Sequence, residues 1–296
     1  MPPNRGSGLG ADLLTGNLVA EFLNNPAVQA ALVPFLVALV LGYALAGTRL
    51  LALAVVSGLL VVLALTIGFA VEPFTAVKKL IVVTLAAASI AVVLEAIRVE
   101  ARRAIVVALV IAAGLAAAWI PLRVFQQMEP SAGWIAALGA FALASLTTGS
   151  AITASGKSSL RAAVIGACLG WGAGILALLG ASALLAQLGL AVGTASAAVA
   201  LVLMIRAGEA PPSWTLVVPA AVAASTIAVL ATATGELRWY CLIPLPVAPL
   251  VTRLLPAAAL RRPWQLAFAT GFAALVPVAA AVALAWISTS STVAAG

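Results

Sequence analysis

The densest group of polar side chains in the sequence is a run of hydroxyls between residues 145 and 159, in an otherwise apolar chain. Hydroxyls beside a helix N-terminus and basic side chains suit a carboxylate or a phosphate, because free N–H groups and cations both favour negative charge. The alternative is an ordinary loop in which Ser158 or Ser159 caps the following helix and Lys157 and Arg161 set the membrane orientation. Under the first interpretation, the run contributes to a small-solute site through Thr147, Thr148, Ser150, Thr153, Ser155 and Lys157.

Part of this run, residues 151–158 (AITASGKS), resembles a relaxed P-loop. A P-loop is a glycine-rich turn between a strand and a helix, and its backbone N–H groups cradle phosphates. Here Ala151 replaces the first glycine, and the preceding residues have the composition of a membrane helix. The single aspartate of the chain is Asp12, so no aspartate follows the motif to hold Mg²⁺. We therefore expect no nucleotide binding.

Prolines interrupt the apolar run 240–258. Each proline removes a backbone donor and disturbs the carbonyl one turn earlier, and such backbone cannot face lipid. Interrupted helices are typical of transporter sites, although they also occur as kinks or short re-entrant pieces. The prolines assigned to the predicted solute site are Pro244, Pro246 and Pro249.

Glu95 is the acidic residue that lies deepest in an apolar run. A carboxylate inside a membrane can carry protons or bind ions, so Glu95 is a further candidate site residue. The alternative is an ion pair at the membrane surface, because Arg98 lies three residues later on the same helical face.

Glycines recur at intervals of four residues at Gly166, Gly170 and Gly174, and again at Gly189 and Gly193. Glycines with this spacing share one helix face and allow another helix to approach closely. We predict that they form close contacts between helices of the bundle. Self-association with a second copy and a pore-lining groove are the alternatives.

The overall composition excludes several classes of protein. Of the 296 residues, 65% are hydrophobic and 8% are charged, which is too apolar for a soluble domain or a disordered chain. The chain has no histidine and one aspartate, and its two cysteines, Cys168 and Cys241, have no metal-binding spacing. We therefore expect no enzymatic activity, no cofactor and no metal site.

The apolar residues form runs that are close to the length of about 20 residues needed to span a bilayer. We predict an all-α, polytopic transmembrane helix bundle of about ten spans, or nine if 240–258 is re-entrant. The predicted domain organisation is an interfacial segment 1–26, one transmembrane domain 27–287 and a tail 288–296. The predicted spans are 27–46, 50–70, 80–97, 104–121, 132–152, 162–185, 188–205, 214–234, 240–258 and 264–287.

The 15 lysines and arginines lie mostly between these runs, ten of them on one set of alternate loops. Because cytoplasmic loops are enriched in basic residues, this bias predicts that both termini lie on the non-cytoplasmic side. The Ala, Leu, Val and Gly bias is typical of a bacterium with a GC-rich genome, so we expect the inner (plasma) membrane. The net charge of +7 indicates contact with lipid headgroups, not with nucleic acid.

These features predict a small-solute transporter or permease of unknown substrate. The alternative is a non-catalytic structural or accessory subunit of a larger membrane complex, because few polar groups lie inside the runs. The expected partners are the lipid bilayer and, through the glycine faces, other membrane proteins or a second copy.

Overall fold

The computed structural model of the chain describes residues 25–26, 28–66, 75–97, 103–156, 158–206, 214–235, 237–255, 260 and 262–293. Within this described part the fold is all-helical, with 87% helix and no strand. Most of the predicted interfacial segment 1–26 lies outside the described residues, as do Lys157 and Arg98.

The helices follow the apolar runs of the sequence because a chain in lipid must satisfy its backbone hydrogen bonds internally. Local signals set several ends: the Thr75 and Ser158 side chains each accept a hydrogen bond from a backbone N–H of the first turn that follows. A π-helical turn, Val28–Leu32, precedes the first α-helix, and a 3₁₀ turn, η2, spans Trp239–Leu242. The α-helices are α2 (Val33–Leu45), α3 (Ala52–Thr66), α4 (Ala76–Ala96), α5 (Arg103–Trp119), α6 (Leu122–Gln126), α7 (Pro130–Ser155), α8 (Ser159–Leu179), α9 (Ala183–Ile205), α10 (Val217–Thr234), α11 (Pro244–Thr252) and α12 (Pro263–Val293).

Seven helices in the described part are long and apolar enough to cross a membrane. They are compatible with a multi-pass bundle, as the sequence predicts. Three further apolar helices coincide with predicted spans but are shorter: Ala52–Thr66, Arg103–Trp119 and Trp239–Thr252. The predicted count of about ten spans therefore stays a prediction, as do the membrane and the side on which the termini lie.

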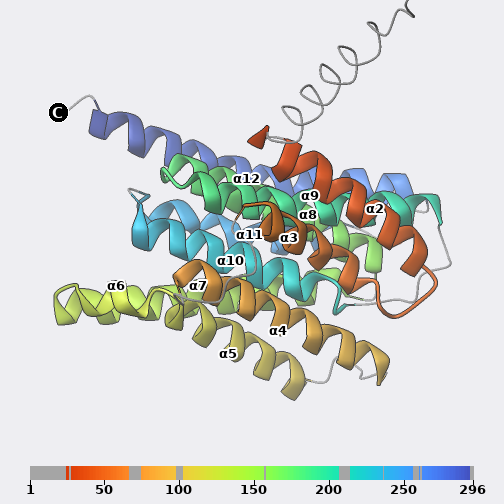
Figure 1. The fold of residues 1–296 in the computed structure, drawn as a ribbon, viewed down its shortest axis with the longest axis horizontal. Helices are drawn as coiled ribbons and strands as arrows, with labels where there is room; N and C mark the ends of the chain where they lie inside the picture. Colours follow the sequence, from red (N-terminus) through yellow and green to blue (C-terminus); the bar gives the residue numbers. More distant parts are fainter. Residues whose placement is uncertain are drawn as a thin grey trace, which may run out of the picture.

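Three contacts identify one end of the bundle, which we call the Glu95 end. Arg49, between α2 and α3, donates from Nη1 to the backbone oxygen of Glu95 at the end of α4, over 3.2 Å. Thr215, just before α10, donates to the Glu95 carboxylate. Arg206, at the end of α9, donates to the backbone oxygen of Tyr43 in α2 over 3.0 Å. Thus α2, α4 and α9 finish at the Glu95 end, and α10 begins there (Figure 1).

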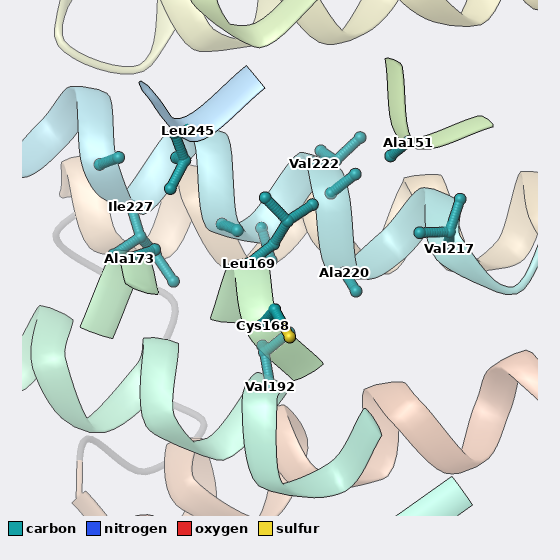
Figure 2. Packing of buried hydrophobic residues seen from close by; sticks show 14 of the residues in the cluster. Ala151, Cys168, Leu169, Ala173, Val192, Val217, Ala220, Val222, Ile227 and Leu245 are labelled. Carbon is teal, nitrogen blue, oxygen red and sulfur yellow. The ribbon is translucent and has the colours of Figure 1, made fainter. Parts of the chain in front are cut away.

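Helices α8 and α10 form the centre of the bundle. In the most apolar stretch of each helix, 89% of the residues of α10 and 78% of those of α8 are buried. The corresponding share is 22% for Val28–Leu45, the continuous helix of which α2 is the larger part. Large buried side chains such as Leu169, Ile227 and Leu245 fill the space between smaller alanines (Figure 2). Helices α7, α9 and α12 pack around α8, whereas α3, α4 and α7 are neighbours of α10.

Several predicted helix boundaries are wrong. Helix α8 ends at Leu179 and not near residue 185, because the chain reverses at Gly180–Ser182, where Ala181 takes a φ of 61°. This turn is composed of small residues, so hydropathy does not detect it. Helix α7 continues to Ser155, beyond the predicted end at 152, and α12 continues to Val293 through most of the predicted tail 288–296. In these two helices the hydroxyls of the last turns donate to carbonyl oxygens of their own helix, so these polar residues need no partner outside it.

Candidate functional site

The hydroxyl run between residues 145 and 155 is helical and belongs to the last turns of α7. Four of its predicted site residues donate to carbonyl oxygens of the same helix, so their hydroxyls are satisfied without a ligand. The loop interpretation is therefore wrong for these residues, although Ser158 does cap α8 by accepting from the Arg161 N–H over 3.2 Å. The bonds are Thr147 to Leu143 (2.8 Å), Ser150 to Thr147 (3.0 Å), Thr153 to Gly149 (2.9 Å) and Ser155 to Ala151 (2.8 Å).

Gly156 ends α7 with a φ of 55°, a left-handed conformation that favours glycine over residues with a side chain. The chain therefore passes from α7 into α8 through a short turn, and no strand precedes the Gly-Lys-Ser sequence within the described residues. The architecture of a P-loop is thus missing from the described part of this segment.

A second set of polar groups is buried and has no hydrogen-bond partner in the described part of the chain. These are the hydroxyls of Thr148, Ser196 and Thr270 and the Nε and Nη2 atoms of Arg161. Arg161 lies on α8, and the three hydroxyls lie on α7, α9 and α12, which all contact α8. Buried polar groups are nearly always paired, so an unpaired group points to a bound water, an ion or a functional role.

Of these four residues, only Thr148 was assigned to the site from the sequence. Ser196 and Thr270 are single hydroxyls inside apolar runs, and no local pattern separates them from the many hydroxyls that bond to their own helix. Their lack of a partner depends on side-chain rotamers and on the neighbouring helices, so it appears only in the tertiary structure.

The proline-rich run forms an interrupted segment within the bundle. The 3₁₀ turn η2 meets α11 at Ile243, and Pro244 occupies the first turn of α11. Pro246 lies in the first turn of α11 and Pro249 lies inside the helix; both are buried, and Pro249 removes a donor that would normally bond four residues back. Helix α11 contacts α7 and α12, so the prolines and the hydroxyl run lie on neighbouring helices.

Glu95 lies apart from these groups, in the last turn of α4 at the Glu95 end, and is half-buried. The buried Thr215 hydroxyl donates to its carboxylate, and Arg49 bonds to its backbone oxygen. Helix α4 packs mainly on α10. Glu95 therefore contacts residues of the segments between helices at this end of the bundle, and it does not belong with the hydroxyl run.

We expect Glu95→Ala to lower the free energy of unfolding by about 1–3 kcal/mol, because the buried Thr215 hydroxyl loses its acceptor. Glu95→Gln keeps an acceptor oxygen and should have a clearly smaller effect. Thermal unfolding of the purified protein in detergent measures both changes. The control is Glu129→Ala, an exposed carboxylate at the start of α7, which should leave the melting temperature unchanged. Equal losses for the alanine and glutamine variants would contradict the assigned hydrogen bond.

The predicted packing glycines Gly166, Gly170 and Gly174 of α8 lie against α9. A Cβ atom added at Gly170 would lie 2.6 Å from the Cα of Gly193, and one added at Gly174 would lie 2.8 Å from the N atom of Leu190. At Gly166 the corresponding neighbour is the Ser196 hydroxyl, 3.1 Å away. Because α9 covers this face, a second copy has no access to it in this conformation.

No protein-family model, curated protein or solved structure matches the chain. Among the described residues, no group of three or more His, Cys, Asp or Glu side chains gathers as a metal site would require. The seven candidate spans and the all-helical fold indicate a multi-pass membrane protein. Its apolar helices are compatible with contact with a lipid bilayer.

Proposed function

We propose that the protein is a small-solute transporter or permease. The observation that carries this proposal is the proline-interrupted segment Trp239–Thr252, which contacts α7 and α12 inside the bundle. Interrupted backbone at membrane depth is tolerated where protein covers it or where it lines a wet cavity. In transporters such segments provide the substrate site and its hinge.

The neighbouring helices support the same proposal. Helix α7 provides the hydroxyl run, including the buried and unpaired Thr148, and α12 provides the buried and unpaired Thr270. The helices that contact α11 thus contain buried polar groups without a hydrogen-bond partner among the described residues. The scarcity of acid–base residues in the sequence, with no histidine and one aspartate, supports a non-enzymatic role.

The test is solute flux into liposomes that contain the purified protein. We expect Pro249→Ala to restore a backbone donor inside α11, raise the melting temperature and slow transport about tenfold, or about 1.4 kcal/mol in activation free energy. The rate should fall because transport uses the interrupted helix as a hinge. Flux measured with a panel of metabolites identifies the transported solute. Thermal unfolding of the same preparation shows whether the variant is folded.

The matched control is Pro130→Ala, because Pro130 is exposed in the first turn of α7, where a proline disturbs no helical bond. It should transport at the wild-type rate. Two outcomes count against the proposal: no flux of any solute by folded protein, or an unchanged rate in the Pro249→Ala variant.

The second candidate is a structural or accessory subunit of a membrane complex. It is favoured by the hydroxyls of α7 and α10, most of which bond to their own helices and leave few polar groups for a solute. Purification in a mild detergent separates the two candidates. A stable monomer without partners excludes the subunit, whereas a stoichiometric partner together with absent flux excludes the transporter.

A further inference from the structure

Helix α12 contains a proline interruption of its own, besides the one in α11. Pro277 is buried and lies near the middle of this 31-residue helix. It has no N–H to donate to the backbone oxygen of Ala273, and its ring crowds that oxygen. Proline at such a position is the usual cause of a helix kink. The two halves of α12 are therefore joined by a weakened turn.

The two interrupted helices meet at one glycine of α8. A Cβ atom added at Gly172 would lie 2.8 Å from Cγ1 of Val278 and 3.5 Å from Cδ1 of Leu245. Val278 directly follows Pro277. The backbone oxygen of Leu245 is the one that loses its usual donor at Pro249, four residues later. Both interruptions therefore lie within about one helical turn of the same contact with α8.

The segments beside the two interruptions also contact each other. Helix α11 packs on α12. The Sγ atom of Cys241 in η2 lies 3.8 Å from the Oγ atom of Ser288, in the half of α12 that follows the proline. At the junction itself, Leu245 and Val278 are 0% and 3% exposed, so helices enclose it. The interrupted segment Trp239–Thr252 and the second half of α12 thus lie side by side.

We propose that the half of α12 after Pro277 moves together with the interrupted segment during transport, and that Gly172 of α8 is the pivot. Two weakened turns beside one contact allow both pieces to tilt without breaking further backbone hydrogen bonds. Because Gly172 has no side chain, Val278 and Leu245 can shift across the surface of α8 at this point. This inference rests on the transport function proposed above and adds α12 to its moving part.

The proposed movement is large enough to measure between spin labels. From Pro277 to Val293 the helix runs about 24 Å, so a change of about 20° in a proline kink moves its end by about 8 Å. A label at Ile287, after the proline, reports this movement against a reference label at Leu178 near the end of α8; both positions are exposed. The control pair keeps the reference label and places the other at the exposed Phe268, before the proline.

The measurement uses the full-length protein in lipid nanodiscs, with the buried Cys168 and Cys241 replaced by alanine so that only the introduced cysteines are labelled. We expect the distance distribution of the first pair to be about twice as wide as that of the control pair. Pro277→Ala restores the missing donor and should narrow the first distribution to the width of the second. Equal widths in the wild type would overturn the inference.

Pro277→Ala should also raise the melting temperature and slow solute flux into liposomes about tenfold, because the stiffened helix resists tilting. The matched control is Pro263→Ala. Pro263 is the first residue of α12, where a proline removes no helical hydrogen bond. This control should keep the melting temperature and the transport rate of the wild type.

Gly172→Ala tests the pivot without changing a proline, and it keeps the test decisive if Pro277→Ala does not fold. The added carbon would lie 2.8 Å from the stiff, β-branched side chain of Val278, so α12 has to shift away from α8. We expect the mean distance of the first label pair to change. In the matched control, Gly271→Ala, the added carbon lies 3.6 Å from Val164, an ordinary contact, and the distribution should stay unchanged. An unchanged distribution in Gly172→Ala would remove Gly172 as the pivot.

The transport proposal and this inference fail in different ways. A wide first distribution that narrows in Pro277→Ala, together with no flux of any solute, would reject the transport function while the moving unit stands. Solute flux at the wild-type rate in Pro277→Ala, or equal widths for the two label pairs, would reject the inference and leave the transport proposal intact.

Discussion

Gly170→Leu is expected to prevent the bundle from folding, with a loss of more than about 3 kcal/mol in the free energy of unfolding. Gly170 of α8 faces the backbone of Gly193 in α9, so a side chain at this position meets main-chain atoms that cannot rotate away. Relief would require separating two central helices along their length. Size-exclusion chromatography of a fluorescent fusion reports the folded fraction directly.

Gly170→Ala adds a single carbon at the same place and should cost about 1–3 kcal/mol. The matched control is Gly139→Leu in α7, because an added Cβ at Gly139 meets no atom within 4 Å. We expect the control to stay within about 0.5 kcal/mol of the wild type. If Gly170→Leu and Gly139→Leu fold equally well, α8 and α9 do not lie as close as the structure places them.

Ile227→Ala is expected to lower the free energy of unfolding by about 2–5 kcal/mol. Ile227 is 0% exposed on the central helix α10 and belongs, with Ala173 and Leu245, to the main cluster of buried hydrophobic side chains (Figure 2). The lost side-chain carbons leave a cavity that the surrounding helices cannot fill without moving. The loss is one of van der Waals contacts, since a membrane offers no hydrophobic driving force between helices.

The control for this prediction is Ile135→Ala on α7, where the side chain is 71% exposed. Lipid or detergent replaces the missing contacts there, so the change should stay below about 0.5 kcal/mol. Unfolding in a mixed detergent series compares the two variants under the same conditions. Equal losses at both positions would show that α10 is not the enclosed helix of the bundle.

Helices α8 and α9 were both predicted as spans, but the residues where they meet were not predicted correctly. The predicted run 188–205 corresponds to Ala183–Ile205, and 162–185 corresponds to Ser159–Leu179. Arg161 precedes the first of these apolar runs and Arg206 follows the second, but no charged residue separates the two. The turn Gly180–Ser182 between them was missed, since its residues are as small as those of the adjoining helices.

The candidate site was predicted less well than the helices. The hydroxyl run of α7 stands out by its density, yet four of its predicted members bond to their own helix. Arg161 was interpreted from the sequence as one of two cations beside the run, and only the structure shows that its Nε and Nη2 atoms are shielded while the side chain as a whole is partly exposed. The proline segment was found by composition, and its contact with α7 and α12 required the structure.

The sequence by itself determined that this protein is a bundle of apolar helices and where most of them lie, because a membrane-spanning backbone must form its own hydrogen bonds. Only the tertiary structure decided that Gly170 meets Gly193 and that α10 is enclosed while α2 lies at the periphery. The physical reason is that lipid is as apolar as a helix interior. Buried and lipid-facing sides then have similar compositions, and helix partners are selected by shape and by a few polar atoms.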